Sequence, residues 1–80
     1  MMHTTQVAEK IGRNVRTLRT YRGESQRDLA DVLEVTRPVI THIESGLRCL
    51  RVTELLILAR HFHVSVEKAL LKGLATKPPF

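Results

Sequence analysis

The sequence has little of what several protein classes need. It has one cysteine, Cys49, so no disulfide can form within the chain, as is typical of proteins in the reducing cytoplasm. Its longest apolar run, residues 55–59, is far shorter than the roughly 18 residues that a membrane-spanning helix needs. The first residues do not combine a basic region with an apolar segment, so no secretory signal is expected. We therefore expect a cytoplasmic protein with no membrane partner.

Patterns for catalysis and for cofactor binding are also missing. There is no glycine-rich phosphate loop and no Gly-x-Ser-x-Gly motif. His61 and His63 suggest a metal by their spacing, but a closed zinc site needs four ligands and Cys49 is the single thiol. One tyrosine and two phenylalanines are too few for an RNA-stacking platform. The sequence predicts a protein that is not an enzyme and that needs no cofactor or metal ion.

Positive charge is in excess and is unevenly spread. The formal net charge is +5 at pH 7. Residues 1–22 are strongly basic, residues 23–36 are acidic, and residues 37–80 are basic again. A segregated basic excess in a small domain indicates a polyanionic partner that binds one side of the molecule.

Apolar residues recur at helical spacing, and no strand-like alternation is present. They predict five short helices, over about residues 5–22, 26–33, 37–45 and 52–62 and after Ser65. Eighty residues leave room for one domain, so the expected fold class is all-α, with five helices around one core. We expect the helices to bury Val7, Ile11, Val15, Leu18, Leu29, Ala30, Leu33, Ile40, Ile43, Leu55, Leu58, Ala59 and Phe62.

Residues 26–45 carry the most informative pattern. Two short helices separated by about three residues must meet at a sharp corner, as in a helix-turn-helix. Ala30 is small where the helices would cross, and Val35 is apolar where the turn needs an anchor. Ile40 and Ile43 would fix the second helix, which leaves its outward face polar. In a helix-turn-helix this second helix lies in the major groove of DNA.

On these residues the chain resembles the λ-repressor-like, Cro-type helix-turn-helix proteins, also called the XRE family. The resemblance covers about residues 11–71 and implies a compact five-helix domain that acts as a homodimer on double-stranded DNA. Three positions depart from the pattern: Glu34 and His63 stand where glycine is common, and Leu50 replaces a usual proline. The resemblance rests on Leu18-Arg19, Ser25-Gln26, Leu29-Ala30, Val35-Thr36, Ile40, Ile43-Glu44-Ser45-Gly46, Leu55, Leu58-Ala59 and Phe62-His63-Val64-Ser65.

The resemblance implies a sequence-specific transcriptional regulator, a repressor, that binds a palindromic operator with the helix over about 37–45 in the major groove. An alternative remains: an antitoxin or partner-binding regulator whose main role is to hold another protein, with DNA autoregulation secondary. A long additional apolar surface or extension would favour that role. Here only residues 74–80 follow the domain, and we expect them to form a flexible tail.

The resemblance also assigns roles to individual residues. The base-reading positions are Arg37, Val39, Thr41 and His42, of which Arg37 is best suited because its fork matches guanine O6 and N7; phosphate contact is the alternative for Arg37 and His42. The phosphate-contacting positions are Gln26, Arg27, Arg48 and Arg51. Arg19 and Glu44 are expected to form an ion pair that fixes the second helix of the motif.

Three apolar residues lie off the inward stripes of the last two helices. They are Ile57, Leu71 and Leu74. Single surface apolar residues are common, but a cluster near the C-terminal end can form a two-fold contact. The sequence therefore predicts a homodimer interface at these residues.

Overall fold

A computed structural model describes residues 4–71 and contains five helices. They are α1 (Thr4–Tyr21), α2 (Gln26–Leu33), α3 (Arg37–Ser45), α4 (Val52–Phe62) and η1 (Val66–Leu71). The all-α fold with five helices is confirmed, and the first four helices begin and end within one residue of the expected positions. The fifth differs in type, because η1 is a π-helix. Leu74 and the tail over 74–80 lie outside the described residues.

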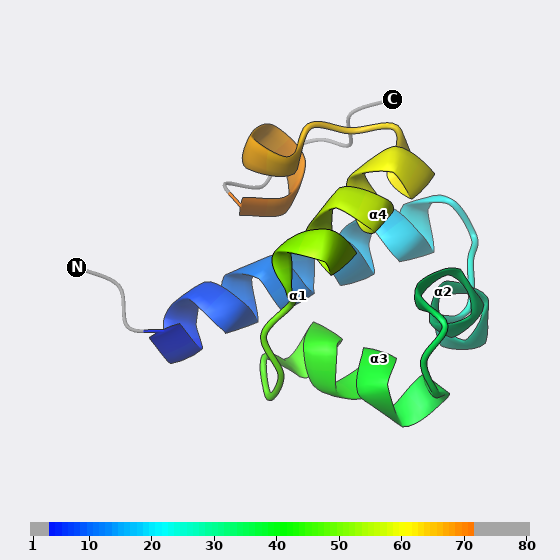
Figure 1. Ribbon diagram of the computed structural model, residues 1–80, viewed down its shortest axis with the longest axis horizontal. Helices are drawn as coiled ribbons and strands as arrows, with labels where there is room; N and C mark the ends of the chain where they lie inside the picture. Colours follow the sequence, from blue (N-terminus) through cyan, green and yellow to red (C-terminus); the bar gives the residue numbers. More distant parts are fainter. Residues whose placement is uncertain (1–3, 72–80) are drawn as a thin grey trace.

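The helices pack into a small bundle in which α3 and η1 lie on opposite sides (Figure 1). α3 packs against α1 and α2, whereas η1 packs against α1 and α4. α2 joins the two halves, because it contacts both α3 and α4. None of the helices within residues 4–71 has the length and apolar character to cross a membrane.

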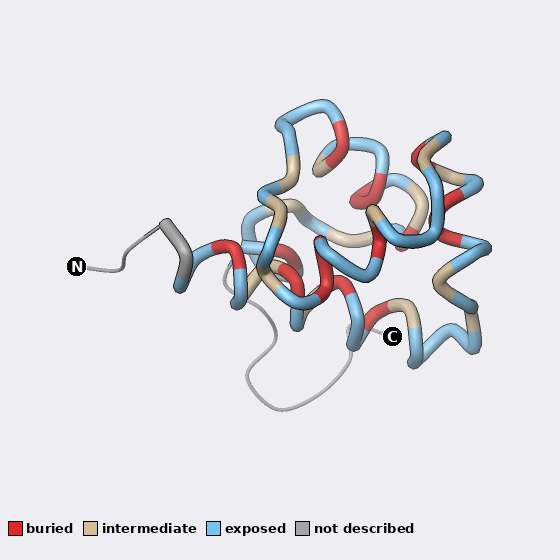
Figure 2. Tube along the Cα trace, turned by 90° about the horizontal axis from the view of Figure 1, so that it is seen from below, coloured by how far each residue is buried: buried red, intermediate tan, exposed pale blue. Residues whose placement is uncertain are grey.

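The core lies where all five helices meet, and its buried positions follow the inner side of the chain trace (Figure 2). The largest fully buried side chains are Phe62, Leu29, Ile40, Ile43, Leu58, Leu70 and Val15. The expected core is confirmed on α2 and α3 and for three residues of α4, while Leu55 is half-buried.

One expected core residue is wrong. Val7 is 40% exposed, and its neighbour Ala8 is buried instead. The inward stripe of α1 therefore runs through Ala8, Gly12 and Val15. Gly12 lies where α3 approaches α1 closely, and the apolar spacing alone could not separate position 7 from position 8.

Helix α2 begins at Gln26, within the predicted range, and Ser25 is its N-cap. Ser25 Oγ accepts a hydrogen bond from the backbone N–H of Asp28 at 3.0 Å, and Asp28 Oδ2 accepts one from the Ser25 N–H at 2.8 Å. This reciprocal capping box satisfies two backbone donors. Thr36 is the N-cap of α3 but makes no side-chain capping hydrogen bond, and Pro38 stands in the first turn.

Four helices end in the same left-handed turn. The left-handed residues after α1, α2, α3 and α4 are Gly23, Glu34, Gly46 and His63, with φ of 71°, 57°, 84° and 57°. In each case the next N–H bonds to a carbonyl five residues back, as in the Val35 to Ala30 contact of 2.9 Å. The two non-glycine residues each cost about 1–2 kcal/mol in this conformation. The turn after α2 thus keeps the glycine-type backbone although Glu34 is not glycine.

Two glycines allow α1 and α3 to approach each other closely. A Cβ atom on Gly12 would collide with the Ile43 carbonyl oxygen and lie 2.8 Å from that of Glu44. A Cβ on Gly46 would lie 2.8 Å from Glu9 Cα. Backbone therefore meets backbone at the C-terminal half of α3, where a larger residue would force the helices apart.

We predict that Gly12→Ala lowers the thermal unfolding temperature. In an open helix this change stabilises by roughly 0.5–1 kcal/mol, but overpacking against a backbone carbonyl costs about 1–3 kcal/mol. The melting temperature should fall by several degrees, as measured by circular dichroism. Thr20→Ala, at an exposed position of α1, is the control and should change little. An unchanged or raised melting temperature for Gly12→Ala would contradict the close approach.

Candidate DNA interface

The outward face of α3 is polar and exposed. Arg37, Thr41 and His42 are all exposed, whereas Ile40 and Ile43 on the opposite side are fully buried. Arg37 and Thr41 are four residues apart and share one side of the helix. Thus three of the four expected base-reading residues lie together on a surface that a groove could accept.

Val39, the fourth expected base-reading residue, is placed differently. Its side chain is half-buried and packs against the core. Only part of it remains for contact with a thymine methyl group. The sequence could not reveal this, because Val39 has the same apolar character in either role.

Gln26 connects the exposed face of α3 to its buried side. Its Oε1 accepts a hydrogen bond from Thr41 Oγ1 at 3.0 Å and one from an Arg37 guanidinium nitrogen at 3.4 Å. Its Nε2 donates to Glu44 Oε1 at 3.1 Å. Because Glu44 fixes the amide, Gln26 presents its oxygen to Arg37 and Thr41. Gln26 is a predicted phosphate contact, and in the structure its amide oxygen instead holds Arg37 and Thr41, two of the predicted base-reading side chains.

The pair expected between Arg19 and Glu44 lies directly behind α3. Arg19 Nε donates to Glu44 Oε2 at 2.6 Å and a second guanidinium nitrogen donates to Oε1 at 3.0 Å. The two side chains are 11% and 4% exposed. The hydrogen bond with Glu44 raises the pKa of Arg19 above its ordinary value. A remaining N–H donates to the Glu24 carbonyl oxygen at 2.8 Å, so one guanidinium joins α1, α3 and the turn before α2.

The expected phosphate-contacting arginines differ in their surroundings. Arg27 and Arg51 have exposed side chains, at the start of α2 and before α4. Arg48 is held by Glu54, with two nitrogen–oxygen distances of 3.0 Å. The carboxylate of Asp28 already lies at the start of α2, where it accepts a hydrogen bond from the backbone N–H of Ser25. This hydrogen bond lowers the pKa of Asp28.

Three features of the site were missed by sequence reasoning. One is the pair of close contacts at Gly12 and Gly46, for which a single sequence gives no signal. The second is Glu54, which a search for acidic residues at the third helical position could have found, because a capping box places one there. The third is His61, whose Nε2 lies 2.8 and 2.9 Å from the carboxylate oxygens of Glu24.

His61 and His63, whose spacing suggests a metal ion, lie at the end of α4 and just after it. Within residues 4–71, no group of three or more His, Cys, Asp or Glu side chains could hold a metal ion. His61 instead ties α4 to the turn between α1 and α2 through Glu24.

We predict strong energetic coupling between Arg19 and Glu44. A double-mutant cycle with Arg19→Met and Glu44→Gln in thermal or urea unfolding should give a coupling above about 0.5 kcal/mol, and toward ~3 kcal/mol for a pair this buried. The more exposed pair of Arg22 and Glu24, 3.5 Å apart, is the control and should couple less. If the effects of the two substitutions simply add, the pair does not hold α3.

Comparison with known proteins identifies the family. A family model described as helix-turn-helix matches residues 15–68. The crystal structure of the restriction-modification controller protein C.AhdI from Aeromonas hydrophila is similar, with a TM-score of 0.68 and 30% sequence identity, over 75% of this chain and 91% of that one. Comparison with curated proteins finds no match. The chain belongs to the XRE-type helix-turn-helix family of DNA-binding transcriptional regulators.

Proposed function

We propose that this regulator is a repressor that binds a palindromic operator as a homodimer, with α3 of each protomer in the major groove. The observation that carries the proposal is the exposed polar face of α3 above the buried Arg19–Glu44 pair. A helix that reads base edges must present its side chains in a fixed direction. The buried pair supplies that fixed direction from behind the helix.

Arg37 is the proposed main base-reading residue. An arginine carries five N–H donors in a fixed fork, and the contact with Gln26 uses one guanidinium nitrogen of Arg37. The remaining donors suit the O6 and N7 acceptors of guanine. Thr41 and His42 are the further proposed base contacts, and the exposed part of Val39 offers an apolar one.

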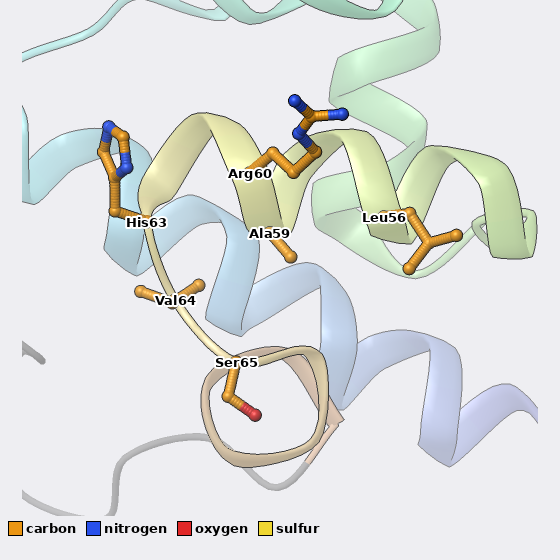
Figure 3. Close-up of a pocket in the computed structure, with 6 residues that line it drawn as sticks. All are labelled: Leu56, Ala59, Arg60, His63, Val64 and Ser65. Atoms are coloured by element: carbon orange, nitrogen blue, oxygen red, sulfur yellow. The ribbon is translucent and has the colours of Figure 1, made fainter.

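The dimer is proposed to form on the side away from α3. Ile57 on α4 and Leu71 on η1 are 42% and 40% exposed, and Leu56 is 53% exposed. Leu56 also lines a shallow groove between α4 and η1, together with Ala59, Arg60 and residues 63–65 (Figure 3). A groove beside exposed apolar side chains is suited to receive the same side chains of a second protomer. Such a dimer would set two recognition helices about 34 Å apart, one turn of DNA.

The similarity to C.AhdI supports a regulatory role. That protein is named as a restriction-modification controller, and it shares 30% of its residues with this chain over 91% of its length. We extend the role of a controller to this chain and propose that it acts as a transcriptional repressor.

We predict that Arg37→Ala relaxes base preference at one base pair in each half-site, by about 1–3 kcal/mol. Arg27→Ala is the matched control, since a phosphate contact at Arg27 would weaken binding to all sequences equally. Competition binding across single-base variants of an operator selected from random DNA measures both effects. Uniform weakening by Arg37→Ala would place that residue on phosphate instead.

We predict that Ile57→Asp gives a helical monomer that binds the operator at least about 100-fold more weakly, because the two half-sites are no longer bound together. Sedimentation, circular dichroism and operator titration test the three parts. Thr17→Asp places the same charge on an exposed position of α1 and should leave the dimer intact. An Ile57→Asp variant that stays dimeric would move the interface elsewhere.

A further inference from the structure

Glu54 occupies a set of donors at the start of α4. Its Oε1 and Oε2 accept hydrogen bonds from the two terminal nitrogens of Arg48, each at 3.0 Å. Oε1 also accepts one from the backbone N–H of Arg51 at 2.9 Å. Glu54 itself is buried, and it stands at the third position of the helix.

These donors are of the kind that binds a phosphate group. A guanidinium fork and a backbone N–H at a helix N-terminus both favour a compact anion with several acceptor oxygens. The loop that carries them joins α3 to α4 (Figure 1), and α3 carries the side chains proposed to read bases. An anion site is therefore built beside the DNA-binding face, and the chain fills it with its own carboxylate.

The charges of Arg48 and Glu54 cancel each other. The hydrogen bonds from Arg48 lower the pKa of Glu54, and the hydrogen bond with Glu54 raises the pKa of Arg48. Both groups are thus ionised at neutral pH. As a closed pair they offer a DNA phosphate no net charge.

Displacement of Glu54 by a DNA phosphate is unfavourable. The side chain of Glu54 is only 11% exposed. Without Arg48 it would be a largely buried carboxylate without its ion pair, next to a phosphate of the same charge. Arg51 differs, because its side chain is exposed while its backbone N–H holds Glu54. Its charge is available on the same loop.

We propose that Glu54 takes the place of a DNA phosphate at this loop, holding Arg48 out of the interface and positioning Arg51 to make the loop's phosphate contact. Glu54 is thus a positioning residue. The inference rests on the DNA-binding function proposed above. The resemblance to the family gave Arg48 and Arg51 the same phosphate-contacting role, whereas this proposal gives that contact to Arg51 alone.

The dependence of operator affinity on salt tests the proposal. Each phosphate contact contributes about 0.9 to the slope of log K against log salt concentration. Fluorescence anisotropy with a labelled operator duplex gives this slope for the wild type, Arg51→Gln, Glu54→Gln and the double variant Arg48→Gln with Glu54→Gln. Circular dichroism and thermal unfolding establish that each variant is folded.

Three results are expected. Arg51→Gln should reduce the slope by about 0.9, because one contact is lost. The double variant should keep the wild-type slope, because it removes a pair without net charge. Glu54→Gln should steepen the slope by about 0.9, because it frees Arg48 to contact phosphate.

Other results overturn the proposal. A reduced slope in the double variant would show that Arg48 already contacts DNA. An unchanged slope for Glu54→Gln would show that Glu54 does not prevent Arg48 from contacting a DNA phosphate. An unchanged slope for Arg51→Gln would show that Arg51 makes no phosphate contact. If Glu54→Gln does not fold, the double variant and Arg51→Gln still decide the matter. Failure of the function itself is distinct, because the wild type would then show no preference for any selected operator.

Discussion

The close contact between α1 and the C-terminal half of α3 is the constraint on which the position of α3 depends. Gly12 and Gly46 let the two backbones meet, and Arg19 on α1 binds both carboxylate oxygens of Glu44 on α3 through Nε and one terminal nitrogen. Glu44 then fixes the amide of Gln26, which in turn contacts Arg37 and Thr41. The two exposed side chains on α3 are therefore linked, through Gln26 and Glu44, to Arg19 on α1.

The fold was largely predictable because its signals are local. The apolar spacing that placed the first four helices is contained within each helix, whereas Glu34 and His63, which follow α2 and α4, give no local stop signal. The inward side of α1 was harder to place, because a helical stripe can begin at Val7 or at Ala8 with nearly the same periodicity. The stripe is settled by packing between helices, which no local pattern contains: Ala8 is buried and Val7 is 40% exposed.

The candidate site was predictable in its residues but less so in their contacts. The positions of Arg37, Thr41, His42, Arg19 and Glu44 followed from the resemblance to the family. The contact between Arg48 and Glu54 did not, because it depends on how the loop after Gly46 turns back toward α4. An arginine in a loop beside a DNA-binding helix has the same sequence signature whether it is free or already paired. Only the distances to Glu54 separate the two cases.

The left-handed residues after α2 and α4 have a consequence for how this domain can change over time. Glu34 and His63 hold a backbone conformation that suits glycine, and each costs about 1–2 kcal/mol. Replacing either by glycine relieves this strain at a position that belongs neither to the core nor to the exposed face of α3. The domain therefore holds a reserve of stability within one substitution of the present sequence. Such a reserve can offset destabilising changes on α3 that alter which operator is bound, so the same scaffold can acquire a new binding preference without losing its fold.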